Sequence, residues 1–335
     1  MNLFRKAAVF TDLHLGLKSN SIVHNNDCLD FIKWFVELAQ NNNCETCLFL
    51  GDYFHNRNVV NLQTMQYGLN GLRLLSRSFE KVIMIPGNHD EYFKDNRTIN
   101  SIAWAEHIPR VQILNEITQV GNTVFAPWLM KGEHTKLKNY SSEYLFGHFE
   151  LPDFIMTGNH KMPRVGEFYA DQLGEYGSVF TGHFHKRQRT GNVKYMGNAF
   201  PHNYGDAGDT ARGAMILEFG SHDETYVDWP GMPRYNFINL SDLDDSLLLP
   251  KTYMRATIDL DITYEEANGM KESLLKEYDL REISLINPRK NFVPELGETA
   301  RHRSIDEIVY EQINKLDSEF FDAETLLNIY RGLEC

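Results

Sequence analysis

The chain is short of cysteine, and it has no long hydrophobic run. Four cysteines in 335 residues do not make a disulfide framework in a chain of this length. No apolar stretch approaches the roughly 18 residues that a membrane-spanning helix needs, and MNLFRKAAVF is too short for a signal peptide. These absences lead us to expect a cytoplasmic protein without a membrane partner.

The cysteine pattern also argues against a common type of zinc site. Cys44 and Cys47 form a single CxxC pair, and a structural zinc site of this type needs a second pair, which the sequence lacks. We therefore expect these side chains to be buried or half-buried, reduced thiols.

Positive charge is scarce as well. With 33 Lys+Arg against 46 Asp+Glu the net charge is −13, whereas nucleic-acid binders usually present a basic face. The excess of acidic residues is uneven along the chain. Residues 1–220 carry 21 Lys+Arg against 22 Asp+Glu, whereas residues 221–335 carry 12 Lys+Arg against 24 Asp+Glu. The first two thirds of the chain could still meet a polyanion if bound cations offset the local carboxylates.

The sequence does contain a regular alternation of apolar runs and amphipathic segments. Strands are predicted at 7–11, 47–52 and 81–86, and helices at 28–40, 61–77 and 98–107. Further along, shorter apolar runs predict the strands VQIL, TVFAPW, EYLFGH, SVFTGH, VKYMGN and GAMILEF. Such a pattern favours a two-sheet α/β sandwich flanked by helices.

The last third of the chain has a different pattern. Apolar and polar residues alternate over 254–262, Thr263 and Glu266 form a capping box for a helix, and REISLI returns as a strand. We predict a compact βαβ-like unit from these elements. Beyond it, apolar stripes predict two amphipathic helices at 304–316 and 323–333.

Five short clusters of metal-competent side chains follow apolar runs. They are TDLHLG, GDYFH, PGNHD, FGH and TGHFH, and they supply Asp12, His14, Asp52, His55, Asn88, His89, His148, His183 and His185. In open α/β sheets ligands gather at the carboxyl ends of the strands, so we expect these side chains to meet. Alternate residues of extended backbone share a face, and His183 and His185 can therefore point into the same crevice.

This mixture of carboxylates, imidazoles and an amide suits cations such as manganese, iron or zinc. Two divalent ions about 3.5–4 Å apart could clamp the attacking and leaving oxygens of a displacement at phosphorus, and Asp52 is our choice for the carboxylate that bridges them. A lone histidine beside a strand is more often structural, which stays the alternative for His55. His160, in the near-copy TGNH, is expected in a loop without a role, and neither His24 nor His202 is assigned one.

The ordered set DxH, GDxxH, GNHD, GH and GHxH resembles the signature of calcineurin-like metallophosphoesterases over residues 7–219. Within that family, GDYFH and the long tail resemble the SbcD-type nuclease subunits of double-strand-break repair, including the bacteriophage recombination exonuclease subunits. The resemblance implies a four-layer α/β/β/α sandwich at 1–235, a small α+β cap domain for DNA binding at 236–290, and a linker with C-terminal helices at 291–335.

The resemblance also implies two divalent metal ions, with manganese expected and magnesium as the alternative. One ion would be held by Asp12, His14, Asp52 and His185, and the other by Asp52, Asn88, His148 and His183.

Other residues receive roles by the same resemblance. His89 would be the catalytic histidine that protonates the leaving oxygen, and His55 would steer the phosphate or His89. Asp90 would brace the loop or support a ligand residue, with a direct role in the reaction as the alternative. From their position beside the metal site, Lys186, Arg187, Arg189 and Lys194 could position DNA phosphates, or they could form a solvated strand face.

Two kinds of partner follow from the resemblance. The helices near 61–77 and 98–107 match the location of a family homodimer interface, with the alternative that their apolar stripes simply cover the sheet. The C-terminal helices would dock on an SMC-like ATPase of the SbcC type, or they fold back on their own domain.

The leading hypothesis is a two-metal DNA nuclease, acting as an exonuclease on duplex ends and an endonuclease on single strands. It would work in recombination and double-strand-break repair with an SMC-like ATPase, in the cytoplasm of a prokaryotic host if the chain is phage-encoded. Two alternatives stay open: a phosphoesterase that acts on a small-molecule or protein phosphate, and a non-catalytic scaffold at DNA ends.

Overall fold

The computed structural model describes residues 3, 5–158, 160–287, 313–314, 322 and 324–327. The chain divides into two compact units, Met1–Ile286 and Asn287–Cys335. The two helices predicted at 304–316 and 323–333 therefore lie almost wholly outside the described residues.

The first large sheet contains the early strands of the chain in parallel. Its order is β14-β13-β1-β2-β3-β4, and β1 to β4 all run in the same direction. The strands are β1 (Lys6–Phe10), β2 (Thr46–Phe49), β3 (Lys81–Met84), β4 (Val111–Ile113), β13 (Gly213–Glu218) and β14 (Asp223–Asp228). The last two are antiparallel, so the sheet is parallel on one side and closes with a hairpin on the other.

The second large sheet has the order β11-β12-β10-β7-β6-β5, and β6, β7, β10 and β12 are parallel. Its strands are β5 (Thr118–Val120), β6 (Thr123–Ala126), β7 (Tyr144–His148), β10 (Ser178–Gly182), β11 (Gln188–Thr190) and β12 (Val193–Tyr195). Val9 and Leu48 of the first sheet belong to the same buried cluster as Phe125, Phe146 and Phe180 of the second. The two sheets therefore pack face to face.

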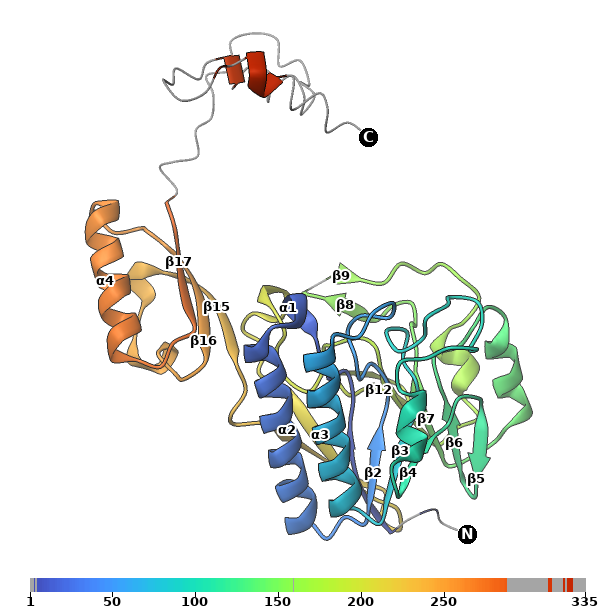
Figure 1. Ribbon diagram of the computed structural model, residues 1–335. Helices are drawn as coiled ribbons and strands as arrows, with labels where there is room; N and C mark the ends of the chain where they lie inside the picture. The colour runs from blue at the N-terminus through green and yellow to red at the C-terminus, as the bar shows by residue number, and fades with distance from the viewer. Residues whose placement is uncertain are drawn as a thin grey trace. The chain divides into compact units, whose positions relative to one another are not determined.

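Helices cover the outer face of the first sheet. In Figure 1, α2 (Ile22–Asn41) and α3 (Leu62–Ser78) run side by side, next to β2. Phe31 and Phe35 of α2 and Leu72 of α3 share a buried cluster with Phe10 and Phe49. Helix α2 begins earlier than its apolar stripe predicts, because the Ser21 hydroxyl caps it by accepting from a backbone N–H.

Short 3₁₀ segments lie against the outer face of the second sheet. They are η2 (Glu133–Asn139) and η3 (Ala170–Leu173), and Leu137 and Leu173 bury their side chains in the cluster beneath them. The predicted α/β/β/α sandwich is confirmed, with this outer layer built from 3₁₀ turns and loops.

Two local predictions were wrong. The helix expected over 98–107 exists only as the 3₁₀ segment η1 (Ala103–His107), because Asn100 forms a β-bridge with Glu91 and this pairing excludes a helix there. The segment around His160 is not simply a loop, since β8 (Ile155–Thr157) and β9 (His160–Lys161) form a two-stranded sheet.

The apolar residues of α3 and of the segment around η1 are partly buried and partly exposed. Leu72, Leu75 and Ile102 are fully buried in the core beneath α3, as the sheet-covering alternative requires. Leu62 is 87% exposed and Ile99 is 54% exposed. The outer part of this stripe is thus available at the surface of the described chain.

After β14, the chain forms a third, smaller sheet. It has the order β15-β16-β17, all parallel, with β15 (Arg234–Asn239), β16 (Thr252–Thr257), β17 (Glu282–Ile286) and the helix α4 (Tyr264–Glu277). The predicted capping box of Thr263 and Glu266 is present. Met254, Ala267 and Ile283 form part of a separate apolar cluster, so this small sheet has a core of its own.

Two further observations bear on composition. Cys44 and Cys47 are free and buried, as predicted, and so is Cys28; burial raises the pKa of Cys44 to about 11. Among the described residues, no helix combines the length and apolar character that crossing a bilayer demands.

Candidate metal centre

The five predicted clusters meet at one edge of the sandwich. Parallel strands of both sheets end there, and backbone hydrogen bonds tie the loops together: Asp12 N–H donates to the Gly51 oxygen at 2.9 Å, and His14 N–H to the Asp52 oxygen at 3.0 Å. Loops far apart in the sequence therefore form one rigid surface.

Several of the side chains depend on an unusual backbone. Asp12, His14, Asp52 and His183 have φ of 52°, 51°, 62° and 89°, in the left-handed region that residues with a Cβ rarely adopt. Such strain persists only where the surroundings fix it, and it is common at functional sites.

Glycines allow the loops to approach each other closely. A Cβ on Gly87 would lie 2.2 Å from the Asp52 Oδ1, and one on Gly182 would lie 2.2 Å from the Thr11 Oγ1. These two positions exclude any other residue, because the site is packed to van der Waals contact around them.

The first group of ligand candidates surrounds the His14 Nε2. This atom is 3.7 Å from the Asp12 Oδ1 and 3.5 Å from the Asp52 Oδ2, while the His185 Nε2 is 3.9 Å from the Asp12 Oδ1. These distances are too long for hydrogen bonds, and the buried His14 Nε2 has no hydrogen-bond partner among the described residues. A cation between these atoms would satisfy all of them.

The second group shares Asp52 with the first. The His148 Nε2 lies 3.4 Å from the Asp52 Oδ2 and 3.1 Å from the Asn88 Oδ1, and the His183 Nδ1 lies 2.8 Å from the same amide oxygen. The His148 Nδ1 donates to the Leu50 oxygen at 2.7 Å, which aims its Nε2 into the group. Asp52 therefore stands where a bridging carboxylate must stand.

Burial and charge set the protonation of these groups. Burial opposes ionisation of Asp12, but the nearby imidazole of His14 and the charge of His148 outweigh burial and lower its pKa to about 2. Burial opposes protonation of His148, yet the charge of Asp52 raises its pKa to about 9. Burial lowers the pKa of His183 to about 3, so this imidazole is neutral at pH 7. His148 would have to release the proton that Asp52 stabilises in order to bind a cation.

The donor set fits divalent cations. Ligand atoms lie within 4.8 Å of one another in the group Asp12, His14 and Asp52 and in the group Asp52, His148 and His183. Two buried carboxylates with several imidazoles favour borderline metals over hard cations such as calcium.

Residues 5–187 match the family model described as calcineurin-like phosphoesterase. The chain belongs to this family. It is therefore a metal-dependent phosphoesterase.

The individual proteins that this phosphoesterase resembles share a quarter or less of its residues. Exonuclease subunit 1 of Enterobacteria phage T4 is 25% identical over 330 residues, which cover 94% of each chain. A nuclease MPE from Pseudomonas putida is 16% identical, with 65% of this chain and 87% of that chain covered and a TM-score of 0.32. A dimetal phosphatase from Danio rerio is 9% identical, with 65% and 93% covered and a TM-score of 0.38.

His89 and His55 lie against the two candidate ligand groups of the phosphoesterase. Their rings stack with centroids 5.1 Å apart, and the His89 Nδ1 donates to the His55 backbone oxygen at 2.5 Å. The His89 N–H donates to the Asp52 Oδ1 at 2.8 Å. The Nε2 of His89 is thus the nitrogen left to exchange a proton.

Asp90 is a buried brace between two loops. Its carboxylate accepts from the backbone N–H groups of Asp52 at 2.8 Å, Gly87 at 3.0 Å, Tyr53 at 3.1 Å and Phe54 at 3.2 Å. These contacts place Asp52 and the PGNHD loop relative to each other.

The basic residues beside the GHFH segment are mostly engaged. Arg187 pairs with Asp228 at 2.7 Å, Lys194 with Glu224 at 2.8 Å, and Arg189 with Glu224 at 3.6 Å. This pairing with β14 makes them less available to a phosphate. Lys186 instead lines a cavity of about 170 Å³.

Sequence reasoning missed two residues at this site. Arg57 donates from its guanidinium to the Asn88 backbone oxygen at 2.5 Å. His202 lines a cavity of about 160 Å³ together with His14, Asp52, His89 and His185. The signal for His202 was its place after VKYMGN, because that strand, β12, ends at the same edge as the strands before the five clusters.

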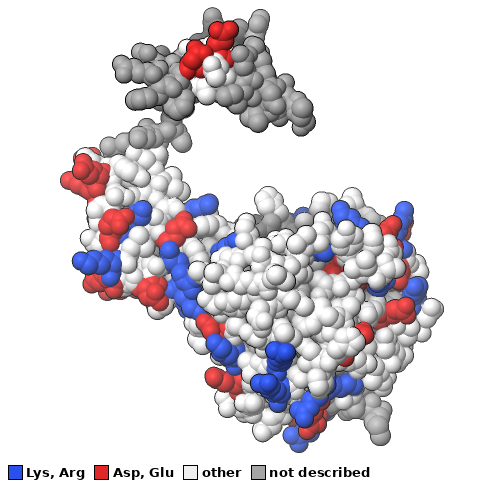
Figure 2. All heavy atoms as spheres, in the orientation of Figure 1, with Lys and Arg blue, Asp and Glu red and all other residues white. Residues whose placement is uncertain are grey.

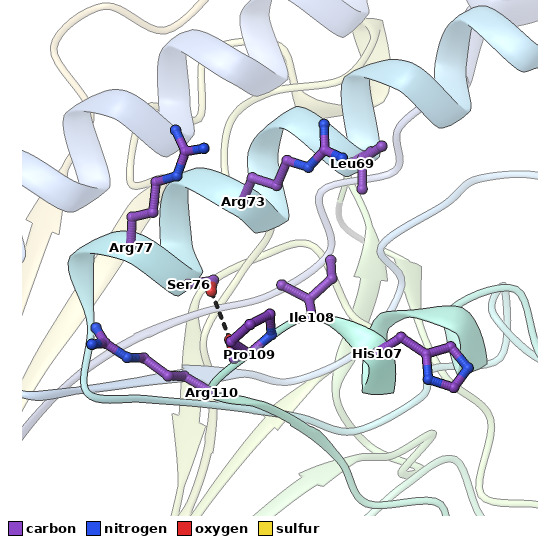
Figure 3. A pocket seen from close by; sticks show the side chains of 8 residues that line it. All are labelled: Leu69, Arg73, Ser76, Arg77, His107, Ile108, Pro109 and Arg110. Carbon is purple, nitrogen blue, oxygen red and sulfur yellow. Dashed lines mark hydrogen bonds between the residues drawn. The ribbon is translucent and has the colours of Figure 1, made fainter.

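A second basic cavity lies apart from the metal centre. Figure 3 shows Arg73 and Arg77 of α3 on one side and Arg110, after η1, on the other, around a cavity of about 570 Å³. The Ser76 hydroxyl donates to the Pro109 oxygen at 2.6 Å and ties the two walls together. This cavity shares no residue with the candidate metal ligands.

Proposed function

We propose that the protein is a two-metal DNA nuclease, which cleaves duplex ends exonucleolytically and single strands endonucleolytically. The observation that carries this proposal is the sharing of Asp52 between two ligand groups at the ends of five strands. The match over 94% of both chains to a protein named exonuclease subunit 1 supports a nuclease over other phosphoesterases.

The proposed ligands are those the motifs predict. Asp12, His14, Asp52 and His185 would hold one divalent cation, and Asp52, Asn88, His148 and His183 the other, with manganese favoured by the imidazoles and magnesium as the alternative. When bound, such a pair neutralises charge on the phosphate and activates water for in-line attack.

The chain's own proton donor is His89. Its Nδ1–H is held by the His55 oxygen, so the proton transferred to the leaving 3′ or 5′ oxygen comes from Nε2. Burial lowers the pKa of His89, which makes the protonated ring a stronger acid. His55 acts as a positioning residue through the ring stack and this hydrogen bond.

A cleft beside the second ligand group could receive a polymer. A cavity of about 490 Å³ contains Asn88 and His183 in its wall, together with Arg57, Lys94, Lys131, Trp128, Glu91 and Glu150. Cations could track a phosphate backbone there, and the Trp128 ring, 5.1 Å from His183, offers a surface for base stacking. A small phosphomonoester would not need a cavity that extends beyond the metal ligands in this way.

Partners and location remain part of the proposal. An SMC-like ATPase would dock on the C-terminal helices, and a homodimer would use the exposed part of the α3 and η1 surface, with the reaction in the host cytoplasm. The small sheet would add DNA contacts as a cap; Figure 2 shows Lys and Arg interspersed with Asp and Glu over it, so its contribution would be weak without the rest of the complex.

The deciding experiment offers the purified protein end-labelled duplex DNA and circular single-stranded DNA, with manganese or magnesium, with and without the partner ATPase. We expect manganese-dependent cleavage of both substrates, and faster hydrolysis of bis-nitrophenyl phosphate than of the mono-ester. A clear preference for the mono-ester with intact DNA would instead establish the small-molecule or protein phosphoesterase. Metal binding without hydrolysis of any of these substrates would leave the scaffold function.

A further inference from the structure

His202 is a buried imidazole without a visible partner. It is 1% exposed, and neither its Nδ1 nor its Nε2 has a hydrogen-bond partner among the described residues. A buried polar atom left unsatisfied costs about 1–3 kcal/mol, so a ring with two such atoms calls for a ligand.

The ring of His202 lies against the first ligand group. Its centroid is 5.3 Å from that of His14 and 5.2 Å from that of His185. One nitrogen from each of these three histidines can be chosen so that all lie within 4.8 Å of one another. This spacing is compatible with three imidazoles that surround a common ion.

The remaining neighbours of His202 offer it no hydrogen bond. His24 packs 5.4 Å away, but its Nε2 is already bonded to the His14 backbone oxygen at 3.0 Å. Phe200, at 5.1 Å, is apolar. A ligand bound in the cavity that His202 lines could satisfy one of these nitrogens.

The backbone of His202 is held in place. Its N–H donates to the Asp206 Oδ2 at 2.8 Å, and the other oxygen of Asp206 lies 3.3 Å from the buried Arg212 guanidinium. Arg212 also pairs with Asp209 at 2.9 Å. Such a supporting network is what a ligand residue needs in order to keep its orientation.

We propose that His202 is an additional nitrogen ligand of the cation held by Asp12, His14, Asp52 and His185. This inference rests on the proposed metal centre but not on the choice of DNA as substrate. With three imidazoles, the first cation site would discriminate more strongly against magnesium than the second, which has two imidazoles and an amide. The first site would also bind manganese more tightly than the second site does.

The test measures manganese binding by the full-length, chelator-stripped protein, using calorimetry and thermal unfolding. His202→Phe keeps an aromatic ring among Phe200, His14 and His24 but removes both nitrogens. We expect wild type to bind two manganese ions, and His202→Phe to lose about 10- to 100-fold in affinity for one of them. His202→Gln, which restores a donor atom, should recover part of that loss.

The stability readout separates a ligand from a packing residue. In chelator, His202→Phe should unfold at the wild-type temperature or above it, because the unsatisfied nitrogens are gone. The rise in unfolding temperature on adding manganese should be smaller than in wild type, because bound ligand stabilises the fold in proportion to its affinity. His107→Phe, at an exposed histidine outside the metal centre, is the control and should keep both the wild-type manganese affinity and the manganese-induced rise in unfolding temperature.

The proposal would be overturned if His202→Phe bound manganese with the same affinity as wild type and showed the same manganese-induced rise in unfolding temperature. His202 would then be a packing or water-bound residue. If His202→Phe does not fold, the same comparison is made with His202→Gln against His202→Leu, and equal manganese affinities in these two variants would also overturn it. A wild-type protein that binds no manganese, magnesium or zinc would overturn the metal centre itself, an outcome distinguishable from loss in the variant alone.

Discussion

The two large sheets and the small sheet differ in how completely their parallel strands are buried. Every residue of β2 and of β7 is buried, whereas β16 alternates between buried and partly or fully exposed residues along its length. The large sheets are covered on both faces, as parallel sheets usually are, while α4 covers one face of the small sheet. Phe237 on β15 is accordingly 56% exposed.

This difference matters for where chemistry can be placed. Fully packed strands hold the strained backbone of Asp12, His14 and Asp52, because their surroundings cannot yield. The small sheet has no comparable cluster in the described residues, and polar contacts link it to α2: the buried Asp27 accepts from Lys251 at 2.9 Å and Arg281 at 3.1 Å. Variants should therefore alter catalysis at the large sheets and stability or substrate handling at the small one.

The largest effect is expected from Asp52→Asn. Both ligand groups lose their common carboxylate, so hydrolysis of bis-nitrophenyl phosphate should fall by about 10⁴-fold, and the manganese stoichiometry should drop below two. Asp153→Asn, at an exposed carboxylate of the same domain, should retain both ions and full activity. Two tightly bound ions in Asp52→Asn would exclude Asp52 as the bridge.

His89→Asn should separate binding from proton transfer. We expect manganese binding to be unchanged and DNA cleavage to fall by about 10³-fold, because the leaving oxygen loses its proton donor. The loss should be much smaller for a nitrophenyl ester, whose leaving group needs no proton. An equal loss on both substrates would contradict the role of general acid, and His107→Asn, at an exposed histidine, serves as the control.

Asp27→Asn tests the attachment of the small sheet. Lys251 and Arg281 would lose a buried charged acceptor, and unfolding free energy should fall by about 1–2 kcal/mol, because both cations are partly exposed and screened. Hydrolysis of a small nitrophenyl ester should not change. Asp30→Asn, one turn away on α2 at a partly exposed carboxylate 3.5 Å from Lys251, should have less effect when both variants are unfolded in urea.

The smallest effect is expected from Thr263→Ala at the start of α4. The variant removes the hydroxyl that accepts from the Glu266 N–H at 3.2 Å, which should cost about 1 kcal/mol in unfolding free energy. Thr263→Ser should restore most of it. A change in the hydrolysis of the small ester would show that the small sheet communicates with the metal centre more strongly than the contrast between the sheets implies.

Much of the site could be predicted because its information is local. Each cluster follows an apolar run, and the end of a strand is encoded by the change from apolar to polar residues within a few positions. Parallel strands place such ends at one edge whatever the details of packing. Asp12, Asp52 and His148 were predicted to meet from that rule alone, and the structure brings Asp12 and His148 to the two sides of Asp52.

The misses depend on partners distant in sequence. The helix predicted over 98–107 is interrupted by the pairing of Glu91 with Asn100, and Arg187 and Arg189 are paired with carboxylates of β14, a strand that was not predicted. His202 follows the predicted strand VKYMGN but belongs to none of the five clusters, and it reaches the site because β12 lies beside β10 and Asp206 holds its loop.

The sequence by itself determined which side chains stand at strand ends. Burial of apolar runs selects the strands, and the polar residues that follow each run end them. Only the tertiary structure decided which of the remaining histidines and arginines join that edge. Their position follows from ion pairs and strand neighbours that no local pattern encodes, because burying a charge or an imidazole depends on what the rest of the chain places beside it.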